Sequence, residues 1–254
     1  MKKTLITLIA LGVIGTGAWH IYQKHSEKMI DDQIEKAEEL MQVDGKVLIA
    51  IDESHEGLKV YYPEFSYIDL VCGQESPKDN AEAILCCAAA FTGSRLADFK
   101  HSNIAGNHVS GGEMHKGYKC IHNTGAFVWY NGKWEFLHKD YAAAMSAAAK
   151  NGGTAFAQNM IIFNGEAQPR YRSNSNIYRA LCELDGKLCV IQSDEEIRYS
   201  EFVDMLMAAG VTHALYLDMG GWREGWYRAK EDADITYLCQ KENKFYTNWI
   251  TFYK

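Results

Sequence analysis

The sequence predicts an α+β fold, with one large mixed or antiparallel sheet, a few packed helices and a single domain after an apolar N-terminal segment. Short apolar stretches separated by turn residues follow one another along most of the chain, which is typical of strands. Two segments with helical spacing, 139–150 and 200–209, lie between those stretches. A chain of 254 residues, 47% of them hydrophobic, is long enough to bury a core of this kind.

The charge of the chain excludes one class of binding partner. Its formal net charge is −7, from 26 Lys and Arg against 33 Asp and Glu, and no long basic run occurs. A nucleic-acid-binding surface needs clustered Lys and Arg, so we expect no nucleic-acid partner. Three prolines and 21 glycines are too few for a collagen-like or proline-rich disordered chain.

Residues 1–25 combine a positive start with an apolar stretch. Lys2 and Lys3 precede the uncharged residues 4–19, and Thr16-Gly17-Ala18 fits the small-residue cleavage site of a signal peptide. An uncleaved membrane anchor is the alternative, because the apolar stretch 4–22 reaches the lower limit of a bilayer span, roughly 17 residues. Both alternatives export the rest of the chain to the periplasm or cell surface, and the second attaches it to the inner membrane.

Residues 26–44 predict a charged helical spacer. Ile30, Ile34, Ala37 and Met41 recur at helical spacing among acidic residues. Charge runs of this kind are usually solvated faces, so we assign this segment no chemistry. The folded domain then spans 45–254.

Its first strands are predicted at 46–51 and 58–62, and its clearest hairpin at 126–138. Asn131-Gly132 suits a type I′ turn, which needs positive φ at both central residues. Counting outward from this turn pairs Trp129 with Trp134 and Phe127 with Phe136 on one face. We interpret that face as a core-facing aromatic ladder in preference to a sugar-binding platform.

Asp185-Gly186 predicts a second hairpin, in which Cys182 faces Cys189. Directly opposed Cα atoms lie roughly 4.5–5.5 Å apart, a separation that a disulfide tolerates. A bridge and two buried thiols therefore stay open, and the thiols are favoured because tight cross-strand bridges are often strained. The chain has seven cysteines, no Cys-x-x-Cys and no histidines at zinc-ligand spacing around them, so we predict no metal site.

The two predicted helices have clear ends. The first stops at Asn151-Gly152-Gly153, and the second begins with Ser200 as N-cap and closes at Gly210. Strands are predicted after them at 213–217, 234–240 and 246–253.

Asp218 ends the 213–217 strand and is followed closely by Gly220 and Gly221. Glycines let backbone N–H groups approach an anionic or hydroxyl-bearing ligand, although an Asp before glycines also commonly caps a turn.

The segment that follows carries Trp222, Arg223 and Trp226. Aromatic faces stack on sugar rings and Arg binds phosphate, whereas the alternative is that the tryptophans anchor the loop to the core. Residues 107–118 are the other candidate stretch, because His108 and Glu113 are side chains that transfer protons.

The order of motifs from residue 158 onward resembles the phosphodiester glycosidase family. Gln158-Asn159-Met160 comes first, followed by Phe163–Glu166, Tyr178-Arg179-Ala180, the Asp185-Gly186 hairpin and the strand ending in Asp218. In the family, an Arg-Thr-Ala or Arg-Ser-Ala segment precedes the hairpin, and an Asp-Gly-Gly-Gly-Ser-Ser-like loop follows the last buried strand. The resemblance covers 45–254.

The resemblance implies an exported hydrolase that cleaves a sugar-1-phosphodiester or a related glycosidic linkage. Family position and residue type together predict that Arg179 holds the phosphate with Arg223 as a second clamp, that Asp218 acts as base or stabilises ring charge, and that Glu113 or His108 is the acid. The predicted substrate-binding residues are Asn159, Gly220 and Gly221, together with Trp222, Arg223 and Trp226, which are proposed from their side-chain chemistry. No particular cofactor is implied.

The sequence also departs from the family pattern. Met219 replaces the first glycine of the loop, Trp222 and Arg223 replace its two serines, and Ala88–Phe91 lacks the family's Asn. These departures favour an alternative on the same fold, a non-catalytic carbohydrate-binding protein of the cell envelope. A purely structural envelope protein is a third possibility.

Overall fold

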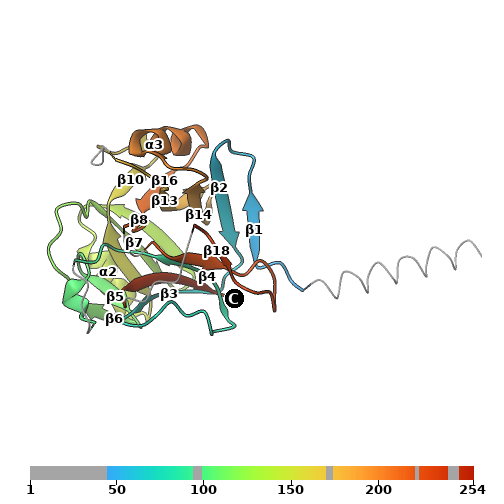
Figure 1. Ribbon diagram of the computed structural model, residues 1–254. Coiled ribbons are helices and arrows are strands. Elements are labelled where there is room, and N and C mark those ends of the chain that lie inside the picture. Colours follow the sequence, from blue (N-terminus) through green and yellow to red (C-terminus); the bar gives the residue numbers. More distant parts are fainter. Residues whose placement is uncertain (1–44, 94–98, 170–173, 221–222, 240–245) are drawn as a thin grey trace, which may run out of the picture. The chain divides into compact units, whose positions relative to one another are not determined.

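The computed structural model describes residues 45–93, 99–169, 174–220, 223–239 and 246–254 (Figure 1). The predictions for 1–25 and 26–44, and for Gly221 and Trp222, lie outside the described residues. Within those described ranges, no helix has the length and apolar character needed to cross a bilayer. The unit considered below is Val47–Lys254.

Antiparallel strands dominate this unit, so the predicted α+β class is wrong and the fold is β-rich. The described residues contain two α-helices, α2 (Ala142–Lys150) and α3 (Tyr199–Ala208), and one short 3-10 turn, η1 (His101–Asn103). The strands succeed one another too closely for helical crossovers, and segments expected to be loops add further short strands. The single large sheet is also wrong, because the strands divide among separate sheets.

The described part of the chain forms three sheets of five or more strands. Sheet I consists, in spatial order, of β1 (Ile49–Asp52), β2 (Leu58–Pro63), β14 (Lys187–Ser193), β13 (Arg179–Leu184), β16 (His213–Tyr216), β10 (Met160–Phe163) and β11 (Glu166–Ala167). Sheet II consists of β18 (Thr236–Tyr237), β17 (Gly225–Tyr227), β4 (Ala83–Ala88), β19 (Asn248–Tyr253) and β3 (Tyr67–Cys72). Sheet III consists of β6 (Glu113–His115), β5 (His108–Ser110), β9 (Thr154–Gln158), β7 (Gly125–Tyr130) and β8 (Lys133–His138). A separate pair joins β12 (Ser175–Asn176) to β15 (Ile197–Arg198).

Hydrophobic residues alternate between the two faces of sheet I and build a core on each. Leu181 and Leu215 point into the core shared with strands of the other two sheets. Ala180 and Cys182 point into the second core, where Phe202 of α3 packs. Helix α3 therefore covers one face of sheet I, as Figure 1 shows at the top of the molecule.

The β7–β8 hairpin confirms the predicted register and turn. Trp129 pairs with Trp134 and Phe127 with Phe136, while Asn131 and Gly132 have φ of 52° and 70°. Phe127 and Phe136 are buried, and Trp129 is only 6% exposed. The aromatic face is therefore mainly core, as predicted.

The β13–β14 hairpin also has the predicted register. Cys182 lies opposite Cys189, and Asp185 and Gly186 both have positive φ. The two cysteines are buried free thiols, which is the favoured of the two alternatives. Burial raises the pKa of both thiols, so they stay protonated.

Both helices start at other residues than predicted. Helix α2 starts at Ala142 rather than at residue 139, because Lys139 and Asp140 have φ of 65° and 43°, which a right-handed helix excludes. Helix α3 starts one residue early, and Ser200 is not its N-cap. The Arg198 N–H there donates to the Glu201 carboxylate at 2.9 Å.

A buried threonine joins sheets II and III. The Thr154 hydroxyl accepts the Leu70 N–H of β3 at 2.9 Å and donates to the Val109 carbonyl of β5 at 2.9 Å. Thr154 is fully buried, so water cannot take over either hydrogen bond.

We expect Thr154→Val to lower the free energy of unfolding by about 2–6 kcal/mol, since two buried backbone groups lose a partner worth about 1–3 kcal/mol each. Urea unfolding measures the loss. Thr251→Val is the matched control, because Thr251 is equally buried and its hydroxyl hydrogen-bonds with side chains of one sheet, the weak acceptor Cys86 Sγ at 3.5 Å and Tyr253. Equal losses in the two variants would show that Thr154 does not join the sheets.

Candidate active site at the junction of three sheets

Ala89, which follows β4, lies where the three sheets meet. Its carbonyl accepts the Asp218 N–H from sheet I at 3.0 Å and the Gln158 Nε2 from the end of β9 in sheet III at 3.2 Å. Its own N–H donates to the Asn248 carbonyl of β19 in sheet II at 3.1 Å. One residue therefore ties together the ends of strands from all three sheets.

Asn159 is the single residue between β9 of sheet III and β10 of sheet I. Its N–H donates to Gln158 Oε1 at 2.9 Å, and its carbonyl accepts the Tyr216 N–H at 2.9 Å. Its side-chain Nδ2 donates to the Tyr199 hydroxyl at the start of α3. Asn159 is 3% exposed, so the structure uses this predicted substrate-binding residue to hold the crossing between the sheets.

Asp218 leaves β16 and turns immediately. One carboxylate oxygen accepts the Gly220 N–H at 3.0 Å, which is the turn-capping arrangement. Met219 holds the turn in place. Its side chain is buried in the core that α3 covers, and its carbonyl accepts a hydrogen bond from Asn176 Nδ2 at 3.0 Å. Asp218 is 5% exposed and Gly220 is exposed, so the turn lies at the edge of the core.

Tyr118 responds to the charge of Asp218. Burial raises the pKa of Tyr118, and the Cys120 thiol and the Asp218 carboxylate raise it further. The tyrosine hydroxyl thus stays protonated to a higher pH than an ordinary tyrosine and is a hydrogen-bond donor.

A cavity of about 420 Å³ lies a few residues further along the chain from Tyr118, beside Asn123 and Thr124. It is lined by Asn123, Thr124, His138, Lys139, Asp140, Tyr141 and Ala142. The Asn123 Oδ1 is buried and has no hydrogen-bond partner among the described residues. Thr124 joins this cavity to the sheet junction, because its hydroxyl accepts the Met160 N–H at 2.9 Å.

Arg179 lies beside Asp218 along the sheet, but its guanidinium is engaged elsewhere. The Arg179 carbonyl accepts the Leu217 N–H, so the two strand ends are adjacent. The guanidinium is fully buried and donates to Gln192 Oε1 at 2.9 and 2.7 Å and to the Glu224 carbonyl at 3.3 Å. A Cβ at Gly225 would lie 2.5 Å from Arg179 Nη1, so the approach requires glycine there. Arg179 thus holds residues 223–225 against sheet I.

The residues that follow Gly220 divide between surface and core. Arg223 is partly exposed, and its Nη1 lies 3.5 Å from Asn176 Oδ1. Trp226 is fully buried, and its indole N–H donates to the Ser76 hydroxyl at 3.1 Å, so it anchors the loop to the core.

Glu224 is a polar residue of this loop that the sequence analysis did not single out. It is 1% exposed, and its carboxylate accepts hydrogen bonds from the Ser76 hydroxyl and from Lys78 Nζ. Glu224 is far in the sequence from Ser76 and Lys78, so no local spacing indicated this buried ion pair.

The other two predicted catalytic residues lie in the β5–β6 hairpin at one end of sheet III. Glu113 is exposed on β6, whereas His108 on β5 is fully buried. The described contacts of His108 are with His101, His115 and the Gly106 carbonyl. The structure thus groups Asp218, Asn159, Gly220, Arg179 and Arg223 around the sheet junction and places His108 and Glu113 in a separate hairpin.

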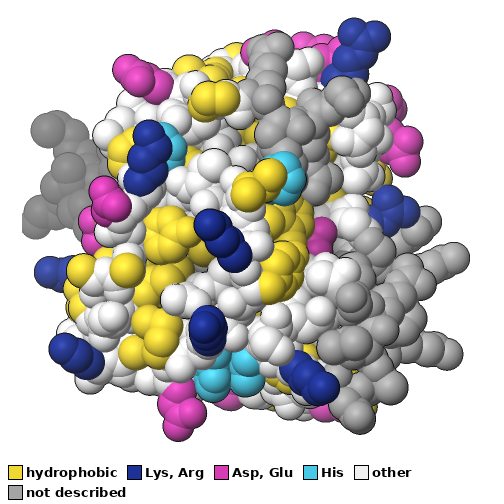
Figure 2. All heavy atoms as spheres, turned by 90° about the vertical axis from the view of Figure 1, so that its left-hand side faces the viewer, with side chains coloured by type: hydrophobic (Ala, Val, Ile, Leu, Met, Phe, Trp, Pro, Cys, Tyr) yellow, Lys and Arg dark blue, Asp and Glu magenta, His cyan; other side chains and the backbone are white. Residues whose placement is uncertain are grey.

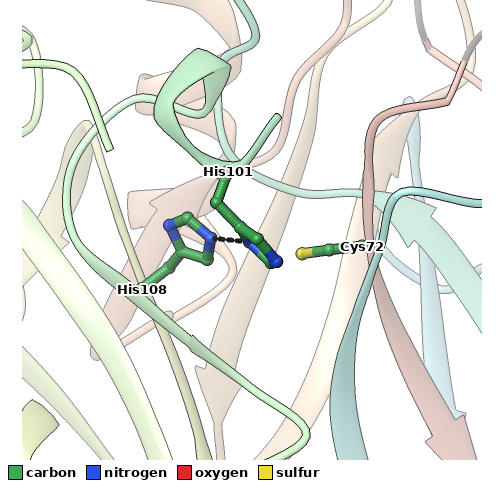
Figure 3. A group of neighbouring side chains, drawn as sticks. All are labelled: Cys72, His101 and His108. Atoms are coloured by element: carbon green, nitrogen blue, oxygen red, sulfur yellow. Dashed lines mark hydrogen bonds between the residues drawn. The ribbon is translucent and has the colours of Figure 1, made fainter. Parts of the chain in front are cut away.

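A cluster of metal-ligand side chains surrounds His108, and the sequence analysis missed it. Cys72, His101 and His108 bring their ligand atoms within 4.8 Å of one another. Figure 3 shows the side chains converging from the end of β3, from η1 and from the start of β5. Cys72 and His101 are far apart in the sequence, and only the packing of sheet II on sheet III brings them together. Exposed histidine atoms also gather at the lower edge of the face in Figure 2, the side on which β5 and β6 lie in Figure 1.

Burial sets the protonation of this cluster. It lowers the pKa of His108 to about 4, and it raises the pKa of Cys72 to about 12. His108 is therefore neutral and Cys72 is a thiol near neutral pH.

Comparisons with known proteins show a distant fold relationship. No protein-family model matches the sequence, and no curated protein is significantly similar to it. The fold is similar to that of the zebrafish N-acetylglucosamine-1-phosphodiester α-N-acetylglucosaminidase catalytic domain auto-inhibited by its pro-peptide, with a TM-score of 0.54, 10% identity and 83% of each chain covered. A hypothetical protein from Synechocystis matches with a TM-score of 0.46 and 9% identity, over 81% of this chain and 61% of that one. The chain thus shares the fold of a phosphodiester glycosidase domain.

We expect Gln158→Met to lower the free energy of unfolding by about 1–3 kcal/mol, because the Asn159 N–H loses its acceptor inside the core. Gln168→Met is the control, since Gln168 Nε2 makes an exposed hydrogen bond to the Glu166 carbonyl. Chemical denaturation of both variants measures the difference. A loss at Gln158 no larger than that at Gln168 would contradict the role given to the junction.

Proposed function

We propose that this protein is an exported hydrolase of the phosphodiester glycosidase type, acting on a sugar-1-phosphodiester or a related glycosidic linkage. The observation that carries the proposal is Asp218 at the junction of three sheets, where its carboxylate accepts the Gly220 N–H and its own N–H donates to the Ala89 carbonyl. The shared fold and the order of motifs around Arg179 and Asp218 support it. The apolar segment 4–22 supports export, either as a cleaved signal or as a membrane attachment.

In the proposed reaction, water adds to the anomeric carbon while the bond from that carbon to the phosphate oxygen breaks. The products are the free sugar and a phosphomonoester, and the water supplies the hydroxyl of one and the proton of the other. Asp218 takes a proton from the attacking water or stabilises positive charge on the sugar ring. We assign the Tyr118 hydroxyl the role of a hydrogen-bond donor to the leaving oxygen; it stays protonated throughout, since its pKa is raised from the ordinary value by burial.

The phosphate contact in this proposal belongs to Arg223, because it is partly exposed and its guanidinium contacts Asn176, which also donates to the Met219 carbonyl next to Asp218. A guanidinium binds two phosphate oxygens at once and neutralises the charge that develops on the leaving group. Arg179 is a positioning residue, since its guanidinium holds the backbone of residues 223 and 224. His108 and Glu113 are not needed for these steps.

We expect Asp218→Asn to lower the rate of sugar release by about 100-fold or more, which is the usual effect of losing a general base. The full-length chain is assayed on a panel of sugar-1-phosphodiesters by the reducing sugar released. Asp185→Asn, a change of a carboxylate in an exposed hairpin turn, is the control and should leave the rate unchanged. The assignment would be overturned if the wild type releases sugar and the Asp218→Asn variant releases it at a similar rate.

We expect Arg223→Ala to raise KM for the same substrates about tenfold or more, because the substrate phosphate loses its cation. Arg198→Ala, the removal of an exposed arginine at the start of α3, is the control. An unchanged KM in Arg223→Ala would remove the phosphate-binding role from this residue.

Carbohydrate binding without turnover is the second candidate, and a different site favours it. A cleft of about 480 Å³ lies between strands of sheets I and III and is lined by Tyr62, Phe65, Trp129, Trp134 and Lys187, among others. The Trp129 indole N–H is buried and has no acceptor among the described residues. This N–H is too deeply buried to reach a ligand, so the candidate sugar contacts are the partly buried Trp134 ring and the other aromatic side chains of the cleft, whose faces suit a sugar ring. Glycan-array binding that is lost in Trp134→Ala and kept in Asp218→Asn would identify this cleft as the binding site.

A further inference from the structure

Cys72, His101 and His108 form a cluster whose geometry is close to that of a metal site. His101 Nδ1 lies 2.9 Å from His108 Nε2, and the Cys72 sulfur and one ring nitrogen of each histidine all lie within 4.8 Å of one another. In a tetrahedral zinc site with Zn–N bonds of about 2.0–2.1 Å, two ligand nitrogens lie about 3.3 Å apart. His101 Nδ1 and His108 Nε2 therefore need to move apart by only about 0.4 Å for both to bind one ion.

The hydrogen bonds around His108 orient it as a ligand. Its Nδ1 lies 3.2 Å from the Gly106 carbonyl, which can only accept, so Nδ1 carries the proton and Nε2 carries the lone pair. This is the arrangement in which metal-binding histidines are held by a second hydrogen bond. His101 Nδ1 then donates the proton that joins the two rings, and an ion would take the place of that proton.

His115 covers the cluster without becoming a ligand. Its ring stacks on the His101 ring with centroids 3.5 Å apart and planes within 2°. Imidazole lone pairs lie in the ring plane, so an ion in the plane of His101 lies outside the plane of His115. The described residues thus supply three ligands, and a water molecule can take the fourth position.

We propose that Cys72, His101 and His108 bind a divalent transition-metal ion of the zinc type. One thiolate and two imidazoles suit zinc, whereas calcium and magnesium require oxygen ligands. Binding is balanced by the loss of one proton, which leaves the Cys72 thiol as the sulfur–metal bond forms. The proton on His101 moves from Nδ1 to Nε2, and His108 keeps its proton on Nδ1. The proposal is independent of the hydrolase proposed above.

The site would also hold two sheets together. Cys72 ends β3 in sheet II, His108 begins β5 in sheet III, and His101 lies in η1 between them in the sequence. An ion that binds the folded chain and not the unfolded one stabilises the fold according to its concentration and affinity.

The test uses the full-length chain after removal of metal with a chelator. Co²⁺ is the spectroscopic probe, because a tetrahedral cobalt–thiolate site has visible d–d bands and a sulfur-to-metal charge-transfer band in the near ultraviolet. We expect one Co²⁺ per chain with both sets of bands, displacement by Zn²⁺, and release of about one proton per Zn²⁺ in calorimetry with buffers of different ionisation enthalpy.

Cys72→Ser should abolish the charge-transfer band and weaken Zn²⁺ binding at least tenfold. Cys120→Ser, which changes another partly buried free thiol, should leave both unchanged. His101→Gln, at a partly exposed ligand, should also weaken Zn²⁺ binding at least tenfold, and circular dichroism verifies that each variant is folded. The proposal is overturned if wild type shows no saturable binding, or if the folded Cys72→Ser variant keeps the charge-transfer band.

Discussion

The carbonyl of Ala89 is the constraint on which the candidate site depends. It accepts one hydrogen bond from Asp218 at the end of a sheet I strand and another from Gln158 at the end of a sheet III strand. Because Ala89 itself continues a strand of sheet II, the ends of three sheets cannot move independently there. A buried carbonyl with both lone pairs used is costly to release, so the junction is a rigid platform.

The rigid junction at Ala89 explains why the predicted site residues have different roles. Asp218 lies at its edge, in a turn with the exposed Gly220, whereas the side chains of Asn159 and Arg179 are engaged in holding the sheets and residues 223 and 224. Buried polar side chains with every group satisfied specify a single arrangement, and they do so by giving up contact with solvent. The proposed chemistry therefore belongs to the few groups at the edge, with the buried ones acting as their support.

Local patterns in the sequence predicted local structure well. The Asn131-Gly132 and Asp185-Gly186 turns determined the register of both hairpins correctly, because positive φ at two successive residues leaves few alternatives. The division of strands into three sheets was not predictable, since it depends on pairings between distant segments such as β3 with β19. The cluster at His108 was missed for the same reason: Cys72 and His101 become neighbours only after two sheets have packed, and nothing in their spacing indicates it.

Native-state hydrogen exchange tests the junction most directly. The account predicts that the Asp218 and Asn159 amides exchange only by global unfolding, with the same free energy of opening as the Leu181 amide at the centre of sheet I. The Gly220 amide, at the exposed edge, should exchange at a lower free energy. Opening of the Asp218 and Asn159 amides well below the global free energy of unfolding would contradict the claim that the junction holds the site rigid.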